Sequence, residues 1–563
     1  MYINNSKFIL EESNDEFKFG KNKSNIDIKF NRVAFIFFIF FVISLIYSIH
    51  LIHLGTRKSD IKIINQYQYK ATNQIKRADI IDRNGTFLAK TVSSIDIGIN
   101  PVEIIDQKKL ILNLRYIFPN KNYDLVKLNI KKNKFFWFEK KISEENYEKL
   151  MKLGDKSIKS EEKLRRIYPQ KNLFSHIIGQ IDDDNIGISG LEKSLDEKLK
   201  INDTPVRLSV DKDIQFLIRE ELLKYNEIFK TLGSAAILMN VNSGEVISIV
   251  SLPDFDPNER NTITDVNYIN RATKGVYELG SVFKTFTLAA ALNQGTVEPE
   301  TEFKNLKKSI RCGKNTISEY DNKIPSDLTA EQILIRSGNI GSVRIGQSVG
   351  LNNYKIFLDD LNLINSINFD IEEVGVPVPF NWGKCKLATV SYGHGITTTI
   401  LQLTNAYSII ANGGYQINPT LIKINRNLKR ERLLKKDVSN KIIQILRKIV
   451  ITKEGTASLA NVEGYEIGGK TGTAQKSTIG GYSRDKINTF VSIFPISKPK
   501  YSLVVMLDEP KINSEYIYHY RDGSGIKYKG TPFNTAGWTS VEVAGQIIEK
   551  IGPILATKYL QIN

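Results

Sequence analysis

VYELGSVFKTFTLAAAL, residues 276–292, places Ser281 and Lys284 one turn apart at the start of an apolar helix. Gly280 ends an extended approach to this helix, and the residues from Phe283 onward are mostly apolar, which predicts burial on most sides. Residues i and i+3 of a helix share a face, so the serine hydroxyl and the lysine amine can come within hydrogen-bonding reach. We therefore predict an activated serine at this position.

A lysine can activate the serine in such a pair only if its pKa is lowered. A serine hydroxyl is a poor nucleophile unless a neighbour takes its proton, and a lysine can do so only in its neutral form. The reference pKa of lysine is about 10.4, so a base at pH 7 needs a shift of about three units, or about 4 kcal/mol. Burial, the positive end of a helix dipole and a second cation all lower the pKa of a lysine. A second cation near Lys284 is therefore expected.

A serine followed by a lysine three residues later is weak evidence by itself, because the chain repeats this spacing elsewhere. It recurs at Ser59, Ser160, Ser209, Ser483, Ser497 and Ser524. Most lysines of this kind are exposed and have no special role. Ser281 differs because it opens a long apolar helix and is followed by two partner motifs.

The first partner motif is Ser337-Gly338-Asn339 in RSGNIGS, between two predicted helices. A hydroxyl and an amide at such a turn can relay a proton to or from Lys284 and can hold a substrate amide. The S-x-N spacing also occurs at 366–368, so on its own it would be an ordinary capping turn.

The second partner motif is Lys470-Thr471-Gly472-Thr473 in EIGGKTGTAQK, which is predicted to lie on a strand. Gly472 lets the backbone come close to a ligand, the lysine and the threonine hydroxyls suit a carboxylate, and an edge strand can pair with an extended peptide. Lys470 is also the second cation expected to keep Lys284 neutral. The tripeptide K-T-G occurs only here in the chain.

Length and charge restrict the function further. At 563 residues the chain is long enough for two or three domains. Its formal charge is +17, but the basic residues are spread along the chain without a basic stripe or an RNA-binding motif, so we do not expect nucleic-acid binding. A basic surface next to an anionic membrane or polymer is the simpler explanation.

Cysteine and histidine usage argues against metal or redox chemistry. The two cysteines, Cys312 and Cys385, form no C-x-x-C pair, and the sequence leaves open whether they form a disulfide. The five histidines form no H-E-x-x-H cluster, and the chain has no G-x-S-x-G motif. We therefore expect neither metal binding, dithiol redox chemistry nor a Ser-His-Asp triad.

An apolar run at Val33–Leu54, VAFIFFIFFVISLIYSIHLIHL, contains no charged residue. It is long enough to span a hydrocarbon layer of about 30 Å, and no small-residue cleavage site follows it, so we predict an uncleaved transmembrane anchor. Residues 1–32 are polar and are predicted to be a short flexible cytoplasmic tail. Five basic residues precede the run closely and four follow it, a bias that slightly favours a cytoplasmic N-terminus.

Two larger regions follow the anchor. Residues 55–205 mix strand and helix patterns without a catalytic motif, and we interpret them as an α+β pedestal domain; RADIIDRNGTFLA at 77–89 predicts two strands around a turn at Asn84-Gly85. Residues 206–563 begin and end with strand patterns and have helical patterns between them. This order predicts an α/β domain whose sheet is assembled from distant parts of the chain.

The motifs S-x-x-K, S-x-N and K-T-G, in this order within one domain, form the set found in penicillin-binding proteins and serine β-lactamases. Together with IIDRNGTFLA, GISGLEKSLDE, NRATKGVYELGSVFK, SYGHGITTTILQLTNAYSIIANGG, GGKTGTAQK and TAGW, they make the chain resemble a class B penicillin-binding protein of the division-septum (FtsI) type over nearly its whole length beyond the tail. The resemblance implies a mixed α/β fold with a penicillin-binding/β-lactamase-like transpeptidase domain, a pedestal of the dimerisation type and one transmembrane helix.

The resemblance also implies roles for the motif residues. Ser281 would attack the carbonyl of the penultimate D-alanine of a stem peptide, and Lys284 would take its proton. The S-x-N motif would shuttle the proton and orient the substrate, and the K-T-G-T segment would bind the terminal carboxylate. The backbone amides of Ser281 and Thr473 would form the oxyanion hole, and no metal or organic cofactor is implied. Catalysis is thus assigned to Ser281, Lys284, Ser337, Asn339 and Lys470, and substrate binding to Thr471, Gly472 and Thr473.

By the same resemblance the protein would cross-link peptidoglycan during septal cell-wall synthesis and would be a target of β-lactams. It would be anchored by a single pass in the bacterial inner membrane, with its catalytic domain in the periplasm. Stem peptides, a SEDS-type glycosyltransferase and other division proteins are the expected partners. The chain departs from the usual family pattern at Leu279, Val282 and Ala78, and none of these departures removes a catalytic group.

Three alternatives remain open at this point. An elongation-type class B enzyme would share all three motifs. A serine β-lactamase would use the same nucleophile but needs a base that activates water, and the segment between Ser337 and Lys470 has no E-x-x-L-N pattern. A non-catalytic division scaffold would not need the catalytic residues, all of which are present.

Overall fold

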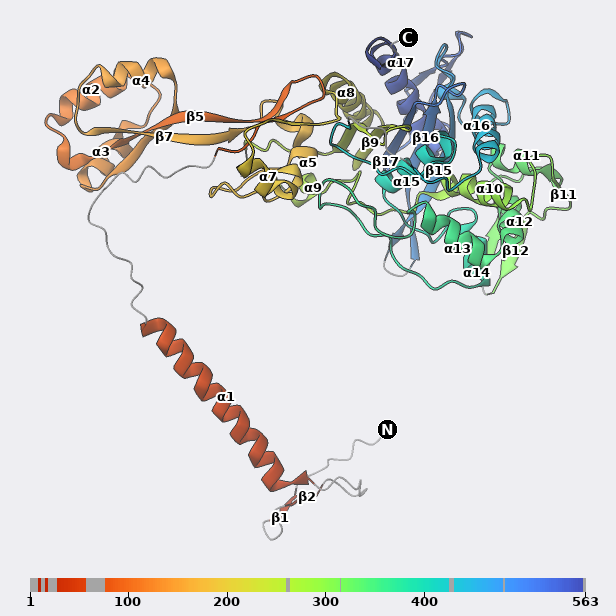
Figure 1. Cartoon of the computed structure of the whole chain (residues 1–563), viewed down its shortest axis with the longest axis horizontal. Coiled ribbons are helices and arrows are strands. Elements are labelled where there is room, and N and C mark those ends of the chain that lie inside the picture. Colours follow the sequence, from red (N-terminus) through yellow and green to blue (C-terminus); the bar gives the residue numbers. More distant parts are fainter. Residues whose placement is uncertain are drawn as a thin grey trace. The chain divides into compact units, whose positions relative to one another are not determined.

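The computed structural model in Figure 1 describes residues 9–11, 16–18, 28–56, 76–259, 264–313, 315–424, 430–478 and 481–559. These residues fall into two compact units, one within Met1–Asn73 and the other within Gln74–Asn563.

A long apolar helix, α1 (Phe30–Thr56), is the main element of the first unit. Its segment Ala34–Ile52 has a mean hydropathy of 2.6, so it is long and apolar enough to cross a membrane. Large apolar side chains along this segment are exposed, which is unfavourable in water. The run predicted at Val33–Leu54 is therefore helical and is a candidate membrane span.

Residues 1–32, predicted as a flexible tail, contain short strands. They are β1 (Ile9–Glu11), β2 (Glu16–Lys18) and β3 (Ile28–Lys29), which pair antiparallel in the order β1-β2-β3. Strands of two or three residues are too short to show an alternation of apolar and polar residues, so the sequence did not indicate them.

A five-stranded sheet organises the N-terminal part of the second unit, in the order β6-β5-β4-β8 with β7 pairing along β5. Its strands are β4 (Ile80–Ile81), β5 (Phe87–Ile99), β6 (Phe136–Ile142), β7 (Ile158–Ile167) and β8 (Val206–Arg207). The turn predicted at Asn84-Gly85 joins β4 to β5, and Gly85 has a φ of 94°, which favours glycine. Because β8 pairs with β4, the chain returns to this sheet after residue 205, and the boundary at 205/206 stays a prediction.

Three helices at the far end of β5 enclose a small core of their own. They are α2 (Gln107–Ile117), α3 (Tyr123–Lys131) and α4 (Glu144–Met151). Ile97 and Ile99 of β5 are buried in this small core, whereas Leu88 and Ala89 of the same strand belong to the main core. The long strand β5 therefore connects the two cores.

A buried ion cluster holds this region together. The Glu192 carboxylate accepts hydrogen bonds from Nε of Arg77 at 3.0 Å and from Nε of Arg166 at 2.6 Å. The side chains of all three residues are at most 1% exposed. The surrounding short helices are η2 (Lys171–Phe174), α5 (Ser175–Ile178), α6 (Gly190–Ser194) and α7 (Asp196–Ile201).

An antiparallel five-stranded sheet, in the order β10-β9-β17-β16-β15, forms the centre of the C-terminal part of the second unit (Figure 1). Its strands are β9 (Gly233–Asn240), β10 (Val246–Leu252), β15 (Gly468–Thr478), β16 (Gly481–Phe494) and β17 (Tyr501–Asp508). Because β9 pairs directly with β17, the prediction of a sheet built from distant parts of the chain is confirmed. Two helix pairs cover this sheet, α8 (Lys212–Phe229) with α17 (Ser540–Tyr559) and α15 (Ile400–Ala411) with α16 (Lys436–Ile451).

The segment between β10 and β15 is mainly helical and contains α10 (Phe283–Gln294). This helix is buried from Phe283 to Leu292, as predicted, and it contacts α12 (Asn339–Val349) and α16. The other helices of the segment are α9 (Asp265–Tyr268), α11 (Ala330–Ile335), α12 (Asn339–Val349), α13 (Leu351–Asp360) and α14 (Lys384–Val390). The short elements outside the main sheet are β11 (Glu302–Phe303), β12 (Ser309–Cys312), β13 (Asn315–Ser318), β14 (Leu328–Thr329), β18 (Ile517–His519) and β19 (Lys527–Lys529).

A disulfide joins Cys312 at the end of β12 to Cys385 in α14, with Cα atoms 5.4 Å apart. The sequence left this pairing open. The bond links residues 73 positions apart and ties the β12–β13 hairpin to α14.

We expect this disulfide to stabilise the fold, because a cross-link across a loop of this length removes about 4 kcal/mol of chain entropy from the unfolded state. Cys312→Ser should lower the free energy of unfolding by about 2–4 kcal/mol, measured by urea denaturation. Reductant should bring the wild type to the stability of the variant and leave the variant unchanged. An equal response of both proteins to reductant would contradict the cross-link.

The buried ion cluster generates a second stability prediction. Glu192→Ala leaves two buried guanidinium groups without their shared carboxylate, which should cost about 3–5 kcal/mol of unfolding free energy. Glu197, an exposed glutamate on the neighbouring helix α7, provides the matched control. Glu197→Ala should stay within about 0.5 kcal/mol of the wild type. Similar denaturation midpoints for the two variants would refute a structural role for the cluster.

Candidate active site

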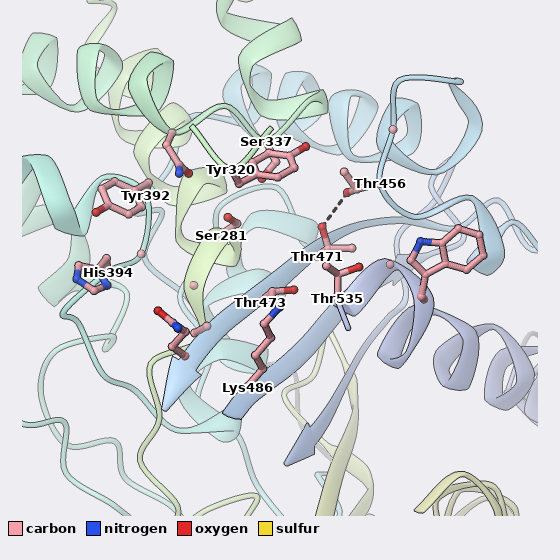
Figure 2. Close-up of a pocket in the computed structure, with 18 of the residues that line it drawn as sticks. Ser281, Tyr320, Ser337, Tyr392, His394, Thr456, Thr471, Thr473, Lys486 and Thr535 are labelled. Carbon is pink, nitrogen blue, oxygen red and sulfur yellow. Dashed lines mark hydrogen bonds between the residues drawn. The ribbon is translucent and has the colours of Figure 1, made fainter. Parts of the chain in front are cut away.

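A cavity of about 570 Å³ opens at the N-terminal end of α10 (Figure 2). Five of the predicted site residues line it: Ser281, Ser337, Asn339, Thr471 and Thr473. The other three, Lys284, Lys470 and Gly472, are buried directly behind them. All three motifs therefore meet at one place, although nearly 190 residues separate the first from the last.

Ser281 lies in a single 3-10 turn, η4 (Gly280–Val282), that leads into α10. The turn is pressed against β15: a Cβ atom on Gly472 would lie 2.1 Å from the carbonyl oxygen of Leu279, so only glycine permits this approach. The Tyr407 hydroxyl donates to the carbonyl of Val282 at 2.8 Å and fixes the start of the helix. The Ser281 side chain remains partly exposed to the cavity.

Lys284 is 1% exposed, and its amine points to the S-x-N motif. Nζ donates to the Ser337 carbonyl at 2.5 Å, to the Ser337 hydroxyl at 3.2 Å and to Asn339 Oδ1 at 2.7 Å. The predicted hydrogen bond between Lys284 and the Ser281 hydroxyl is not formed among the described residues. The amine bonds to the S-x-N motif instead. Catalytic hydrogen bonds of unliganded sites are often loose and tighten when substrate binds.

Ser337 occupies the bend between α11 and α12 and has a φ of 58°, in the left-handed region that a serine rarely adopts. Glu319 holds the next turn in place, because its carboxylate accepts from the backbone N–H groups of Asn339 at 2.7 Å and Ile340 at 2.9 Å. An acidic cap at a helix N-terminus is favourable. The bend directs the Ser337 hydroxyl between two lysines.

Lys470 on β15 is the second of these lysines and is completely buried. Its amine donates to the Ser337 hydroxyl at 2.9 Å and to the carbonyl of Thr471 at 3.1 Å. The Thr471 hydroxyl lies 2.7 Å from the Thr456 hydroxyl, the contact drawn in Figure 2. The Thr473 hydroxyl accepts from the backbone N–H of Ala536 at 2.9 Å. The threonines, and not the lysine, thus present polar atoms to the cavity.

Burial lowers the pKa values of both lysines. It lowers the pKa of Lys284 to about 7, against an opposing influence of the Glu319 carboxylate. It also lowers the pKa of Lys470 well below its usual value, and the charge of Lys284 lowers the pKa of Lys470 further. The two buried amines are close enough for the charge of one to oppose protonation of the other. The expectation that Lys470 supplies the cation that keeps Lys284 neutral stays a prediction.

Several residues of this site were not predicted. Glu319 was missed because it caps a helix from a loop 20 positions before Asn339, and the sequence carries no signal for this contact. Tyr392 and His394 lie in the quoted segment SYGHG and line the cavity, as Tyr320 and Thr456 do (Figure 2). The donors around Ser281 are hydroxyls, amides and amines, and no group of three His, Cys, Asp or Glu side chains within the described ranges is placed to hold a metal ion.

Comparison with known proteins agrees with this geometry. Residues 234–525, more than half of the chain, match the penicillin-binding protein transpeptidase domain, and residues 72–222 match the penicillin-binding protein dimerisation domain. The probable peptidoglycan D,D-transpeptidase FtsI of Caulobacter vibrioides is 29% identical over 497 residues, which cover 86% of this chain and 82% of that protein. The peptidoglycan D,D-transpeptidase FtsI of Buchnera aphidicola subsp. Baizongia pistaciae is 29% identical over 493 residues, 78% of this chain and 84% of that protein.

The fold also matches a solved structure. The crystal structure of penicillin-binding protein 3 of Mycobacterium tuberculosis, complexed with aztreonam, has a TM-score of 0.64 and 22% identity, and the match covers 85% of this chain and 97% of that one. These matches confirm the predicted family and the predicted mixed α/β fold with a dimerisation-type pedestal. The chain belongs to the penicillin-binding protein transpeptidase family.

Proposed function

We propose that this protein is a septal peptidoglycan D,D-transpeptidase that forms an acyl-enzyme on Ser281 and that penicillins acylate the same serine. The observation that carries this proposal is the position of the Ser337 hydroxyl between two buried amines, next to a serine that faces the cavity. Such an array can take a proton from one oxygen and deliver it to another atom in the same cavity.

In the proposed reaction, the motif residues divide the proton transfers between them. Neutral Lys284 takes the Ser281 proton as the hydroxyl oxygen attacks the penultimate D-alanine carbonyl, and the Ser337 hydroxyl relays a proton to the nitrogen of the departing D-alanine. The peptide bond breaks, and an ester with Ser281 remains. An amine of a second stem peptide then attacks the ester, forms the cross-link and returns a proton to the serine oxygen through the same groups.

The terminal carboxylate of the donor peptide affects the protonation of both lysines. Thr471 and Thr473 are placed to bind it, with Lys470 directly behind them. A carboxylate in this position raises the pKa of Lys470 and draws a proton onto it. The charge on Lys470 then lowers the pKa of Lys284. The bound substrate therefore favours the neutral form of Lys284, which activates the serine.

We also assign the catalytic part to the periplasm, with α1 as a single-pass anchor in the inner membrane. The apolar helix α1 supports the anchor, and the Cys312–Cys385 bond supports an oxidising compartment, because disulfides persist mainly outside the reducing cytosol. A SEDS-type glycosyltransferase and other division proteins are proposed as partners from the resemblance alone.

Penicillin labelling tests the nucleophile. A fluorescent penicillin should form a stable adduct on the peptide that contains Ser281, detected by mass spectrometry, and Ser281→Ala should abolish it. Ser524→Ala is the matched control, because Ser524 has the same S-x-x-K spacing but is exposed on a loop. Rapid release of hydrolysed penicillin by the wild type would indicate a β-lactamase, and septation in cells that contain only Ser281→Ala would indicate a scaffold.

The pH dependence tests the base. Only neutral Lys284 accepts the proton, and with a pKa of about 7 its neutral fraction rises with pH. The rate of acylation by penicillin should therefore rise about tenfold between pH 6 and pH 8. Lys284→Ala should lower this rate by about 10²–10⁴ and remove the rise. A rate that is flat over this range in the wild type would rule out Lys284 as the base.

A further inference from the structure

The cavity has two chemically different ends on either side of Ser281 (Figure 2). The hydroxyls of Thr471 and Thr473 lie at one end, and the rings of Tyr392 and His394 lie at the other. The first end suits a carboxylate. The second end has no role in the reaction described above.

Glu278, three residues before Ser281, belongs to this second end. It is the one carboxylate among the described residues that line the cavity, and its side chain is 9% exposed. Oε1 accepts from the Tyr482 hydroxyl at 2.8 Å, and Oε2 accepts from the backbone N–H of Gly395 at 2.9 Å. A carboxylate has about four acceptor positions, so both oxygens keep capacity for a further donor.

Aromatic rings accompany this carboxylate. The His394 ring is parallel to the Tyr392 ring, with centroids 5.9 Å apart, and its centroid is 4.8 Å from that of Tyr482. Nδ1 of His394 lies 3.6 Å from Oε2 of Glu278. A carboxylate beside aromatic rings is a favourable environment for an organic ammonium group.

The protein supplies no strong cation to this carboxylate. Lys386 lies close enough for the Glu278 charge to raise its pKa, which burial lowers, but its amine donates to the Gly395 carbonyl and lies 4.0 Å from the centre of the Phe380 ring. Within the ranges that the structure describes, no lysine or arginine forms an ion pair with Glu278. The charge of Glu278 is therefore available to a ligand.

We propose that Glu278, with the rings of Tyr392 and His394, binds the primary ammonium group of a stem peptide. The inference rests on the proposed function and deepens it, because the incoming amine has to reach the Ser281 ester inside this cavity. An ammonium on the acceptor strand and one on the side chain of the donor strand have the same chemistry, and the experiment separates them.

Glu278→Gln removes the charge and keeps an oxygen that accepts hydrogen bonds. Full-length protein in detergent is acylated with an N-acyl-D-alanyl thioester, which has no free amine, and a stem peptide with a diamino acid is added as acceptor. The ratio of aminolysis to hydrolysis product reports acceptor binding independently of the acylation rate. We expect Glu278→Gln to lower this ratio about tenfold at subsaturating acceptor, and Glu278→Asp to restore part of it.

The second arm uses a D-Ala-D-Ala pentapeptide donor with a free side-chain amine and the same peptide with that amine acetylated. If the donor strand supplies the ammonium, Glu278→Gln slows acylation by the free-amine donor about tenfold more than acylation by the acetylated donor. A selective loss in either arm supports the site and identifies its source.

Glu302→Gln is the matched control, because this side chain is 62% exposed and forms an ion pair with Lys304 on the surface. Both readouts should stay at the wild-type level in this variant. If Glu278→Gln behaves like the control, or lowers every reaction equally whether or not the substrate has an amine, the ammonium site is overturned. Failure of the proposed function looks different: the wild type would then not be labelled by penicillin and would form no aminolysis product, and the ammonium site would fall with it.

Discussion

One hydroxyl shared by two buried amines sets the chemistry of this protein. The Ser337 hydroxyl lies 3.2 Å from Nζ of Lys284 and 2.9 Å from Nζ of Lys470, and both amines are out of contact with water. Two ammonium groups this close repel each other, and the repulsion is stronger in the interior than in water. The arrangement is therefore stable only if at least one amine is neutral. The base that the serine needs is thus a product of folding, because only the folded chain brings the three segments together.

Close backbone contacts and one covalent bond keep these segments in place. Gly472 lets β15 touch the turn that carries Ser281. On the opposite side, β13 ends at Ser318, directly before the glutamate that caps α12, and α14 leads into the loop with Tyr392 and His394. Because the disulfide joins the β12–β13 hairpin to α14, it ties together the two segments that form this side of the cavity.

The sequence was sufficient for those features that depend on local pattern. The apolar run after Ser281 predicted a buried helix, and the strand patterns at both ends of the region 206–563 predicted a sheet assembled from distant parts. Contacts between distant polar residues were not predictable. Neither the capping by Glu319 nor the contact of both lysine amines with the Ser337 hydroxyl follows from spacing, because both depend on distances between segments far apart in the chain.

The two ends of the cavity favour ligand groups of opposite charge, and this determines which peptide binds at which end. A transpeptidase has to bind two similar peptides in one cavity without exchanging their roles. With Glu278 at one end, a terminal carboxylate is repelled there, and once Lys470 is protonated, an ammonium group is repelled at the threonine end. Each peptide is thus rejected from the other's position as well as attracted to its own.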